Sequence, residues 1–234
     1  MKGRSVSQRS KPSSLAISTP GEVEQFLHKA LPKKLGRLIF ALDATQSRQP
    51  SWDHAAHVQS EMFQAVERLG GLEVQLVFYR GFGECKASQW TSTARDLQRM
   101  MFNVRCKGGL TQIGKVLANA RKQAEQQPVS ALVFIGDAFE EDIDQVCHKA
   151  GELGLTGTPA LMFHEGKDPV AAQAFKEIAR LTGGAYCGFN SASASNLRDL
   201  LSAAAIFAVG GLAALDSVSS NGVTQLRKAL PPSG

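Results

Sequence analysis

Hydrophobic positions along the chain fall into short continuous runs, which alternate with longer stretches whose apolar residues recur at helical spacing. Continuous apolar runs of about four to eight residues are typical of strands that are buried on both faces of a parallel sheet. One further segment alternates between apolar and polar positions before it becomes apolar, which also favours a strand. The pattern predicts strands over residues 35–43, 72–80, 130–137, 158–165 and 185–189.

Residues 81–90 follow the second strand directly and predict a turn and a short edge strand. The stretches at helical spacing are closed by glycine pairs such as Gly70-Gly71, which are common where helices end. They predict helices over residues 51–71, 93–103, 110–127, 141–154, 169–184 and 196–211, and a short one around 223–230. Strands separated by helices of this length form parallel βαβ units. The predicted fold class is α/β: a doubly wound, mainly parallel six-stranded sheet with one short antiparallel edge strand and helices on both faces.

The domain organisation follows from length and charge. A chain of 234 residues, with 43% hydrophobic and 20% charged residues, suits one domain of about 200 residues with tails. Most of the net charge of +5 lies near the start, which contains no acid and the basic residues Lys2, Arg4, Arg9 and Lys11. We therefore predict a basic flexible tail over residues 1–20, a domain over 21–211 and a C-terminal extension over 212–234. The tail is interpreted as solvated, and no nucleic-acid partner is expected.

The cysteines and the N-terminal residues indicate the cellular compartment in which the protein is expected. The N-terminal stretch lacks the apolar core of a secretory signal, and the four cysteines contain no C-x-x-C pair. Reduced thiols and a cytoplasmic location are therefore expected.

One apolar segment, residues 200–215, carries no charge. A helix that spans a membrane needs about 20 apolar residues, and this segment contains Gly210-Gly211. We interpret it as a buried C-terminal helix that stops at the glycines, and expect no membrane span.

Oxygen-bearing side chains stand where two of the predicted strands end. Asp43, Thr45 and Ser47 alternate after the first strand, and Asp137 ends a later one. In doubly wound sheets the carboxyl ends of the strands meet at one edge, where ligands bind. Hydroxyl and carboxylate oxygens suit Mg²⁺, Mn²⁺ or Ca²⁺ better than zinc or copper.

This pattern resembles the von Willebrand factor type A domain with its metal-ion-dependent adhesion site. In that family a D-x-S-x-S motif follows an apolar strand, a threonine follows a glycine-rich turn, and an aspartate ends a later strand. The corresponding stretches here are Asp43 to Ser47, Gly108-Gly109-Leu-Thr111 and Ile-Gly-Asp137. The resemblance covers roughly residues 35–210, and it departs from the family at Thr45, where serine is usual, and at Ala138, where glycine is common. The metal ligands that it implies are Asp43, Thr45, Ser47, Thr111 and Asp137.

The resemblance implies a function as well as a fold. It implies a protein-binding module that is not an enzyme, in which Mg²⁺, Mn²⁺ or Ca²⁺ keeps an open position for an aspartate or glutamate of a protein partner. Intracellular members of the family are often linked to ATPase or chaperone-like assemblies. Trp52, Asp53 and residues 139–142 would line the rim of such a site, or else cap their helices.

Two alternative functions stay open. A metal-dependent phosphohydrolase could use Asp43 as its nucleophile, although such sites normally gather several carboxylates and Thr45 stands two positions later. A scaffold could also bind partners without any metal. His54 and His57 lie three residues apart on a predicted helix, which can serve zinc, but no further zinc ligands accompany them.

Overall fold

The computed structural model describes residues 35–67, 69–190 and 194–232. The predicted tail over residues 1–20 and its boundary with the domain lie outside this part of the chain. In chain order the elements are β1 (Gly36–Asp43), the 3₁₀ helix η1 (Gln46–Arg48), α2 (Gln49–Val58), α3 (Ser60–Val66), β2 (Leu72–Arg80), β3 (Glu84–Thr91), α4 (Ala94–Phe102), α5 (Ile113–Gln126), β4 (Ala131–Gly136), α6 (Ile143–Leu155), β5 (Ala160–Glu165), α7 (Pro169–Thr182), β6 (Ala185–Phe189), α8 (Ala194–Asp216) and α9 (Asn221–Ala229).

The strands of the described residues form one six-stranded sheet in the order β3-β2-β1-β4-β5-β6. β1 pairs in parallel with β2 and β4, and β5 continues the parallel arrangement from β4 to β6. β3 pairs antiparallel with β2 at the edge. The predicted fold class, a mainly parallel doubly wound sheet with one antiparallel edge strand, is therefore confirmed.

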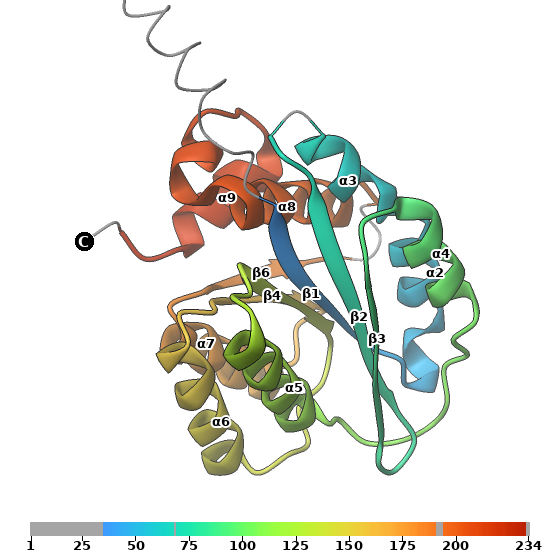
Figure 1. Ribbon diagram of the computed structural model, residues 1–234. Helices are drawn as coiled ribbons and strands as arrows, with labels where there is room; N and C mark the ends of the chain where they lie inside the picture. Colours follow the sequence, from blue (N-terminus) through green and yellow to red (C-terminus); the bar gives the residue numbers. More distant parts are fainter. Residues whose placement is uncertain (1–34, 68, 191–193, 233–234) are drawn as a thin grey trace, which may run out of the picture. The chain divides into compact units, whose positions relative to one another are not determined.

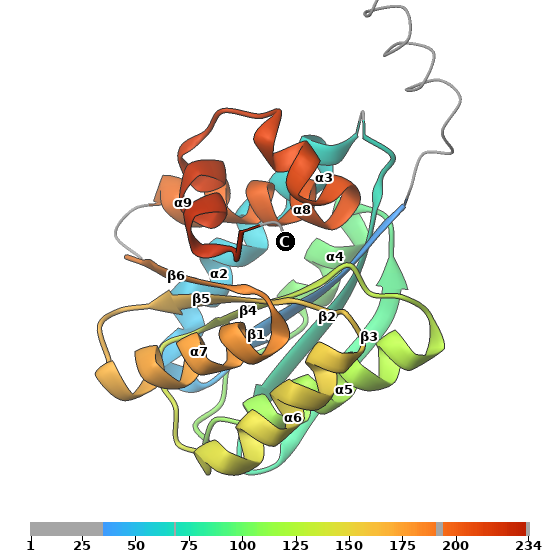
Figure 2. The same ribbon diagram turned by 90° about the vertical axis from the view of Figure 1, so that its left-hand side faces the viewer.

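Helices cover both faces of the sheet. Figures 1 and 2 show α5, α6 and α7 on one side, and α8 and α9 with α2, α3 and α4 on the other. Side chains of a strand point alternately to the two faces. Phe40 and Val133 accordingly belong to the apolar core under α8, whereas Ile39 and Phe134 belong to the core under α5 to α7. The central strands are buried on both sides, which explains their continuous apolar runs.

The predicted helix over residues 51–71 is two helices, α2 and α3, joined at Gln59. Gln59 is buried, and its side-chain amide donates a hydrogen bond to the carbonyl of Ala94 at the start of α4. The helix also begins earlier than predicted, with Pro50 in its first turn, where proline is well tolerated. The difference arises because the apolar spacing continues across the junction while the polar contact to α4 is made only in the folded chain.

The end of the chain continues the core. α8 consists of two helical segments that meet at Gly211, where the prediction placed the end of the helix. The backbone of Gly211 has φ 63° and ψ −154°, a non-helical conformation that glycine adopts readily. Beyond it, Val223 and Leu226 of α9 are buried in the same apolar core as Phe40 of β1. The described residues of the predicted C-terminal extension therefore contribute side chains to the apolar core that covers one face of the sheet.

α8 is also long and apolar enough to match the length and composition of a membrane-spanning helix. Its segment Ser195–Asp216 is the one helix of the described residues that passes this test, and half of its most apolar window is buried inside the protein. The helix contacts α3, α9 and β1, as a core helix does.

Candidate functional site

The order of the strands reverses between β1 and β4. From β1 the chain first builds outward through β2 and β3, and then returns to the other side of β1 with β4. Such a switch point leaves a crevice at the carboxyl ends of the two strands, where doubly wound sheets bind ligands. Asp43 is the last residue of β1, and Asp137 follows the last residue of β4, so both carboxylates lie at this crevice.

The five residues predicted as metal ligands line one pocket of about 220 Å³. Asp43, Thr45 and Ser47 come from the end of β1 and the loop behind it, Thr111 from the loop before α5, and Asp137 from the end of β4. The other lining residues are Gln46, Gly108, Gly109, Ala138 and Glu140. The structure thus brings all five side chains together, and their role as metal ligands stays a prediction.

Asp43 lies at the bottom of this pocket. It is only 3% exposed, and one of its carboxylate oxygens accepts a hydrogen bond of 2.7 Å from the backbone N–H of Thr45. Burial raises the pKa of Asp43, and the charge of Asp137 raises it further, although the hydrogen bonds from Thr45 and the charge of Arg48 lower it. The balance shows that the negative charge of Asp43 is incompletely compensated by the protein.

Tyr79 of β2 is a neighbour of Asp43 that the sequence pattern did not indicate. It pairs with Asp43 in the strand register, and its hydroxyl is fully buried beside the Asp43 carboxylate. Burial raises the pKa of Tyr79 well above its ordinary value, and the charge of Asp43 adds to this, so the hydroxyl stays protonated. A protonated hydroxyl beside Asp43 is available to support the carboxylate as a donor.

Thr111 is held in the pocket by the loop after β4. Its hydroxyl accepts a hydrogen bond of 2.9 Å from the backbone N–H of Glu140, and its own backbone N–H donates to the Glu140 carboxylate at 3.2 Å. Glu141 accepts hydrogen bonds from the backbone N–H groups of Ile113 and Gly114 at the start of α5. Because a hydroxyl oxygen has two lone pairs, Thr111 keeps one for a ligand.

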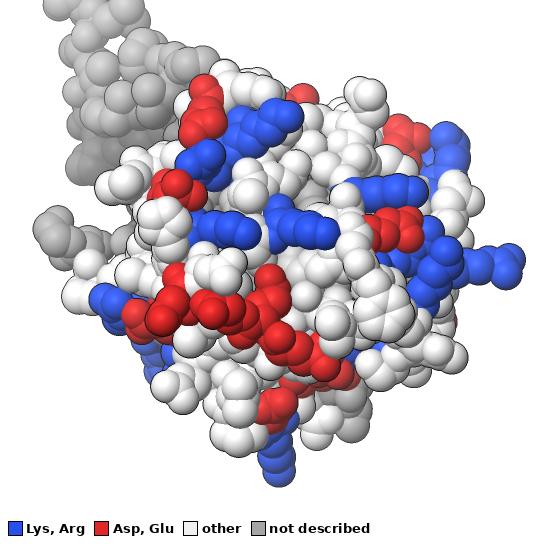
Figure 3. Space-filling model, turned by 90° about the horizontal axis from the view of Figure 1, so that it is seen from below, with Lys and Arg blue, Asp and Glu red and all other residues white. Residues whose placement is uncertain are grey.

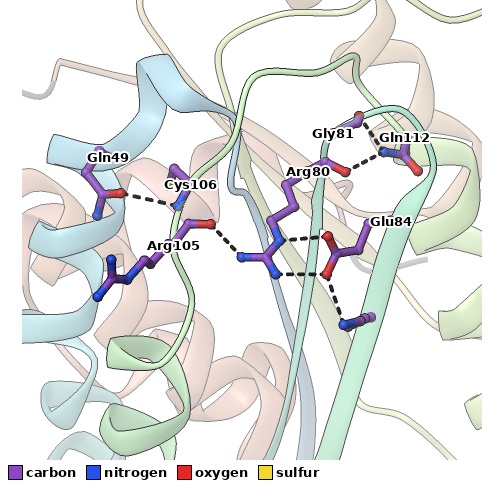
Figure 4. A network of polar contacts seen from close by, with 8 residues as sticks. Gln49, Arg80, Gly81, Glu84, Arg105, Cys106 and Gln112 are labelled. Atoms are coloured by element: carbon purple, nitrogen blue, oxygen red, sulfur yellow. Dashed lines mark hydrogen bonds and ion pairs between the residues drawn. The ribbon is translucent and has the colours of Figure 1, made fainter.

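A polar network fixes the loop that carries Thr111 to the β2–β3 hairpin (Figure 4). The Arg80 guanidinium donates two hydrogen bonds of 2.9 Å to Glu84 and a third to the carbonyl of Arg105. The side-chain amide of Gln112 donates to the carbonyls of Arg80 and Gly81. These bonds tie both ends of the loop to the end of β2, so the position of Thr111 depends on the hairpin.

Two predicted rim residues have other roles. Trp52 is 2% exposed in the core, and its indole N–H donates to the carbonyl of Met101, so the prediction that it lines the rim is wrong. Asp142 caps α6 by accepting a hydrogen bond from the backbone N–H of Gln145. The sequence could not separate these roles, because an aromatic residue at the start of a helix packs inward or outward according to the neighbouring helices.

Solved structures with the same arrangement of elements were found by comparison of the fold. A von Willebrand factor type A protein from Catenulispora acidiphila has a TM-score of 0.61 and 14% sequence identity, over 76% of this chain and 43% of that one. The SpRpn10 VWA domain has a TM-score of 0.55 and 12% identity, over 70% and 94%. The vWF domain of the type V pili tip protein Mfa5 from Porphyromonas gingivalis has a TM-score of 0.59 and 8% identity, over 77% and 97%.

The chain has the von Willebrand factor type A (VWA) fold. No protein-family model and no curated protein matches the sequence, and identities of this size concern the fold alone. The chain spans less than half the length of the Catenulispora protein. The function of a chain with the VWA fold therefore depends on the residues at its site, and not on the fold alone.

Arg48 is a charged residue at the VWA site that the sequence pattern did not indicate. It is only 4% exposed, and its guanidinium forms ion pairs with Asp137, at 3.5 Å, and with Glu165 at the end of β5. Ser51 donates a hydrogen bond of 2.8 Å to the other oxygen of Glu165. An arginine in a polar loop is usually solvated, so its place in the sequence gave no signal of this burial.

The donor set at the pocket fits a hard divalent cation. The five predicted ligands that line this small pocket carry two carboxylates and three hydroxyls, and Glu140 adds a third carboxylate to the lining. Among the residues that the structure describes, no group of three or more His, Cys, Asp or Glu side chains is arranged so that it could hold a metal ion, so hydroxyls would have to supply the remaining ligands. The raised pKa of Asp43 indicates a place where additional positive charge is stabilising.

The surface around the pocket is divided by charge. Viewed from the side toward which β1 runs, acidic side chains form a band across the protein, with Lys and Arg side chains beside it (Figure 3). The loops after β4 and β5 carry exposed acids, including Glu140, Asp142 and Asp168. A field of this sign attracts cations toward the edge of the sheet.

Proposed function

We propose that this chain is a protein-interaction module that holds a divalent cation, Mg²⁺ or Mn²⁺, with Asp43, Thr45, Ser47, Thr111 and Asp137. The single observation that carries the proposal is that these five oxygen-bearing side chains, from three separate segments, line one pocket at the switch point of the sheet. Chance placement of five such residues at the ligand position of this fold is a poor alternative.

Each residue has a definite part in this proposal. Asp43 supplies the buried charge at the bottom of the pocket, and Thr45 keeps its carboxylate oriented through the backbone hydrogen bond. Thr111 is fixed by Glu140 so that its hydroxyl faces the same space. Because three of the five ligands are neutral, the two carboxylates only balance the charge of a bound Mg²⁺, and the ion can still accept a carboxylate of a partner at an open coordination position.

The surroundings suggest what else the partner presents. Phe82, at the tip of the β2–β3 hairpin, is 87% exposed, and Leu110, beside Thr111, is 49% exposed. The backbone N–H of Leu110 donates to the carbonyl of Gly81, so the two apolar side chains belong to adjoining segments. We infer a partner segment with an acidic residue for the cation, an apolar residue for this patch, and basic residues against the acidic band.

A phosphohydrolase is less well supported by the same geometry. Such enzymes present a basic side chain to the phosphate. Arg48, the arginine that pairs with Asp137, is buried and engaged by two carboxylates. We therefore propose binding rather than catalysis at this pocket.

The test is a calorimetric titration of Mn²⁺ and Mg²⁺ into the purified protein. Wild-type protein is expected to bind one ion, and Asp43→Asn and Thr111→Ala are expected to lose this binding while they keep the thermal unfolding transition. Thr224→Ala, at an exposed position of α9, is the matched control and should bind as wild type does. Equal binding by all four proteins, or no binding by the wild type, would contradict the proposal.

A further inference from the structure

Asp137 stands between two pockets. It lines the candidate cation pocket together with Asp43 and Thr111, and it also lines an adjoining pocket of about 330 Å³ together with Arg48 and Glu165. Asp137 therefore belongs to the lining of the candidate cation pocket, while its carboxylate also meets the Arg48 guanidinium at 3.5 Å.

Arg48 is itself shared between two acids. The side chain is 5% exposed, and its two terminal nitrogens reach different carboxylates, one on Asp137 and one on Glu165. Glu165 is the more buried of the two acids, with 10% of its side chain exposed against 33% for Asp137. The hydrogen bond from Ser51 further fixes Glu165, so this acid is the stationary anchor of the arginine.

The guanidinium and a divalent cation would compete for the same carboxylate. A positive charge a few ångströms from the pocket opposes a second positive charge, and the carboxylate that pairs with Arg48 has less charge left for a metal. The contact with Asp137 is the longer of the two contacts of the arginine and goes to the more exposed acid, which makes it the weaker one. Arg48 also lines the adjoining pocket, which gives the guanidinium space to turn away while Glu165 holds it.

We propose that Arg48 sets the cation affinity of this site by occupying Asp137, and that cation binding requires the guanidinium to release Asp137 and remain with Glu165. This inference rests on the proposed function, since it concerns the same pocket. It makes Arg48 a residue that positions and neutralises a ligand, and it makes Glu165 the residue that determines how readily Arg48 is withdrawn.

The decisive variant removes both charges at once. Arg48→Met with Glu165→Gln leaves the net charge near the pocket unchanged, so any gain in affinity comes from the release of Asp137 and not from a general change of field. Replacing both members of a buried ion pair also avoids leaving one charge unpaired. The matched control is Arg121→Met with Glu152→Gln, which removes an ion pair of 2.9 Å between α5 and α6.

The experiment measures Mn²⁺ affinity by calorimetry for wild type, the Arg48/Glu165 variant, the control pair and Asp43→Asn, with thermal unfolding to establish that each is folded. We expect the Arg48/Glu165 variant to bind Mn²⁺ about tenfold more tightly or better, and the control pair to bind as wild type does. If that variant does not fold, Arg48→Lys replaces it, since a lysine lacks the fork that reaches both carboxylates and should also bind the ion more tightly.

The outcomes separate this inference from the proposed function. Wild-type binding that is lost in Asp43→Asn but unchanged in the Arg48/Glu165 variant would overturn the inference and leave the cation site standing. Binding by the Arg48/Glu165 variant alone would overturn the proposed function, because the native site then holds no ion, and would support the inference that Arg48 occupies Asp137 in place of a cation. No binding by any of the proteins would overturn both.

Discussion

Gly109 offers the sharpest test of how the Thr111 loop is held. A Cβ atom at this position would lie 2.1 Å from the carbonyl oxygen of Gly81 and 2.4 Å from its carbon, which are backbone atoms that cannot turn away. The adjacent Gly108 differs: a Cβ there would meet only the end of the Gln46 side chain, at 3.7 Å. Neither glycine has a positive φ, so alanine is compatible with both backbone conformations.

The expected magnitudes follow from these distances. Replacing glycine by alanine restricts the unfolded chain and stabilises by about 0.4–1 kcal/mol where no clash occurs, which is the expectation for Gly108→Ala. Forcing a methyl group into the contact with Gly81 costs about 1–3 kcal/mol, because the loop and the hairpin must separate. The two effects have opposite signs, so the variants should differ by about 1.4–4 kcal/mol and, for a domain of this size, by about 3–16 °C in Tm, with Gly109→Ala the lower.

The assay pairs thermal unfolding with Mn²⁺ calorimetry on both variants. Gly109→Ala should also bind the cation more weakly, because the displaced loop carries Thr111 away from Asp43. If the two variants unfold at the same temperature and bind Mn²⁺ alike, the close approach of the loop to the hairpin is not a feature of the protein in solution, and the reasoning fails.

Three further predictions concern the body of the domain. Burial lowers the pKa of His164, so on acidification the unfolded chain takes up a proton that the folded chain does not. The free energy of unfolding should therefore fall as the pH drops below about 6.5. Denaturant titrations at several pH values should show a flatter pH dependence for His164→Gln. Leu226→Ala in α9 removes a buried side chain and should lower the free energy of unfolding by about 2–5 kcal/mol. The neighbouring variant Gln225→Ala loses an exposed hydrogen bond to Gly188 and should lower it by at most about 1 kcal/mol. Equal effects of the two variants would show that α9 is not part of the core. Burial raises the pKa of Cys187 to about 12, so this thiol should resist iodoacetamide at pH 8 in the native protein and react once denaturant is added, as peptide mapping would show.

The sheet could be predicted because its signal is local. The apolar runs at the centre of the chain have no polar alternation, and that pattern arises only where both faces of a strand are covered. The break at Gln59 was missed because the hydrogen bond that accompanies it goes to Ala94, on a helix that lies far along the chain. The glycines at the end of an apolar stretch, by contrast, correctly indicated a stop, because the helical conformation is interrupted at Gly211 and a second helical segment follows it.

The candidate site also contains some residues that could be predicted from the sequence and others that could not. Asp43 and Asp137 could be placed together from the sequence, because the ends of neighbouring parallel strands necessarily share an edge. Arg48 and Glu165 could not, since their ion pair depends on how a 3₁₀ turn lies against β5, and arginine and glutamate are the residues most often found solvated. The position of Tyr79 beside Asp43 could not be predicted either. The spacing of residues along a strand shows which face each residue occupies, but it does not show which residue of the neighbouring strand lies beside it.

The order of the strands also has a consequence for how the chain is made. Among the described strands β1 is the first to leave the ribosome, yet it lies in the middle of the sheet, and one of its two partners, β4, begins only at Ala131. At synthesis rates of about 5–20 residues per second, the apolar edge of β1 stays unpaired for several seconds after β2 has formed. An unpaired apolar edge is a template for pairing with other chains, so the nascent protein passes through an interval in which a chaperone that covers β1 raises the yield of folded molecules. The strand that positions the buried aspartate is thus also the one that exposes the unfinished chain to aggregation.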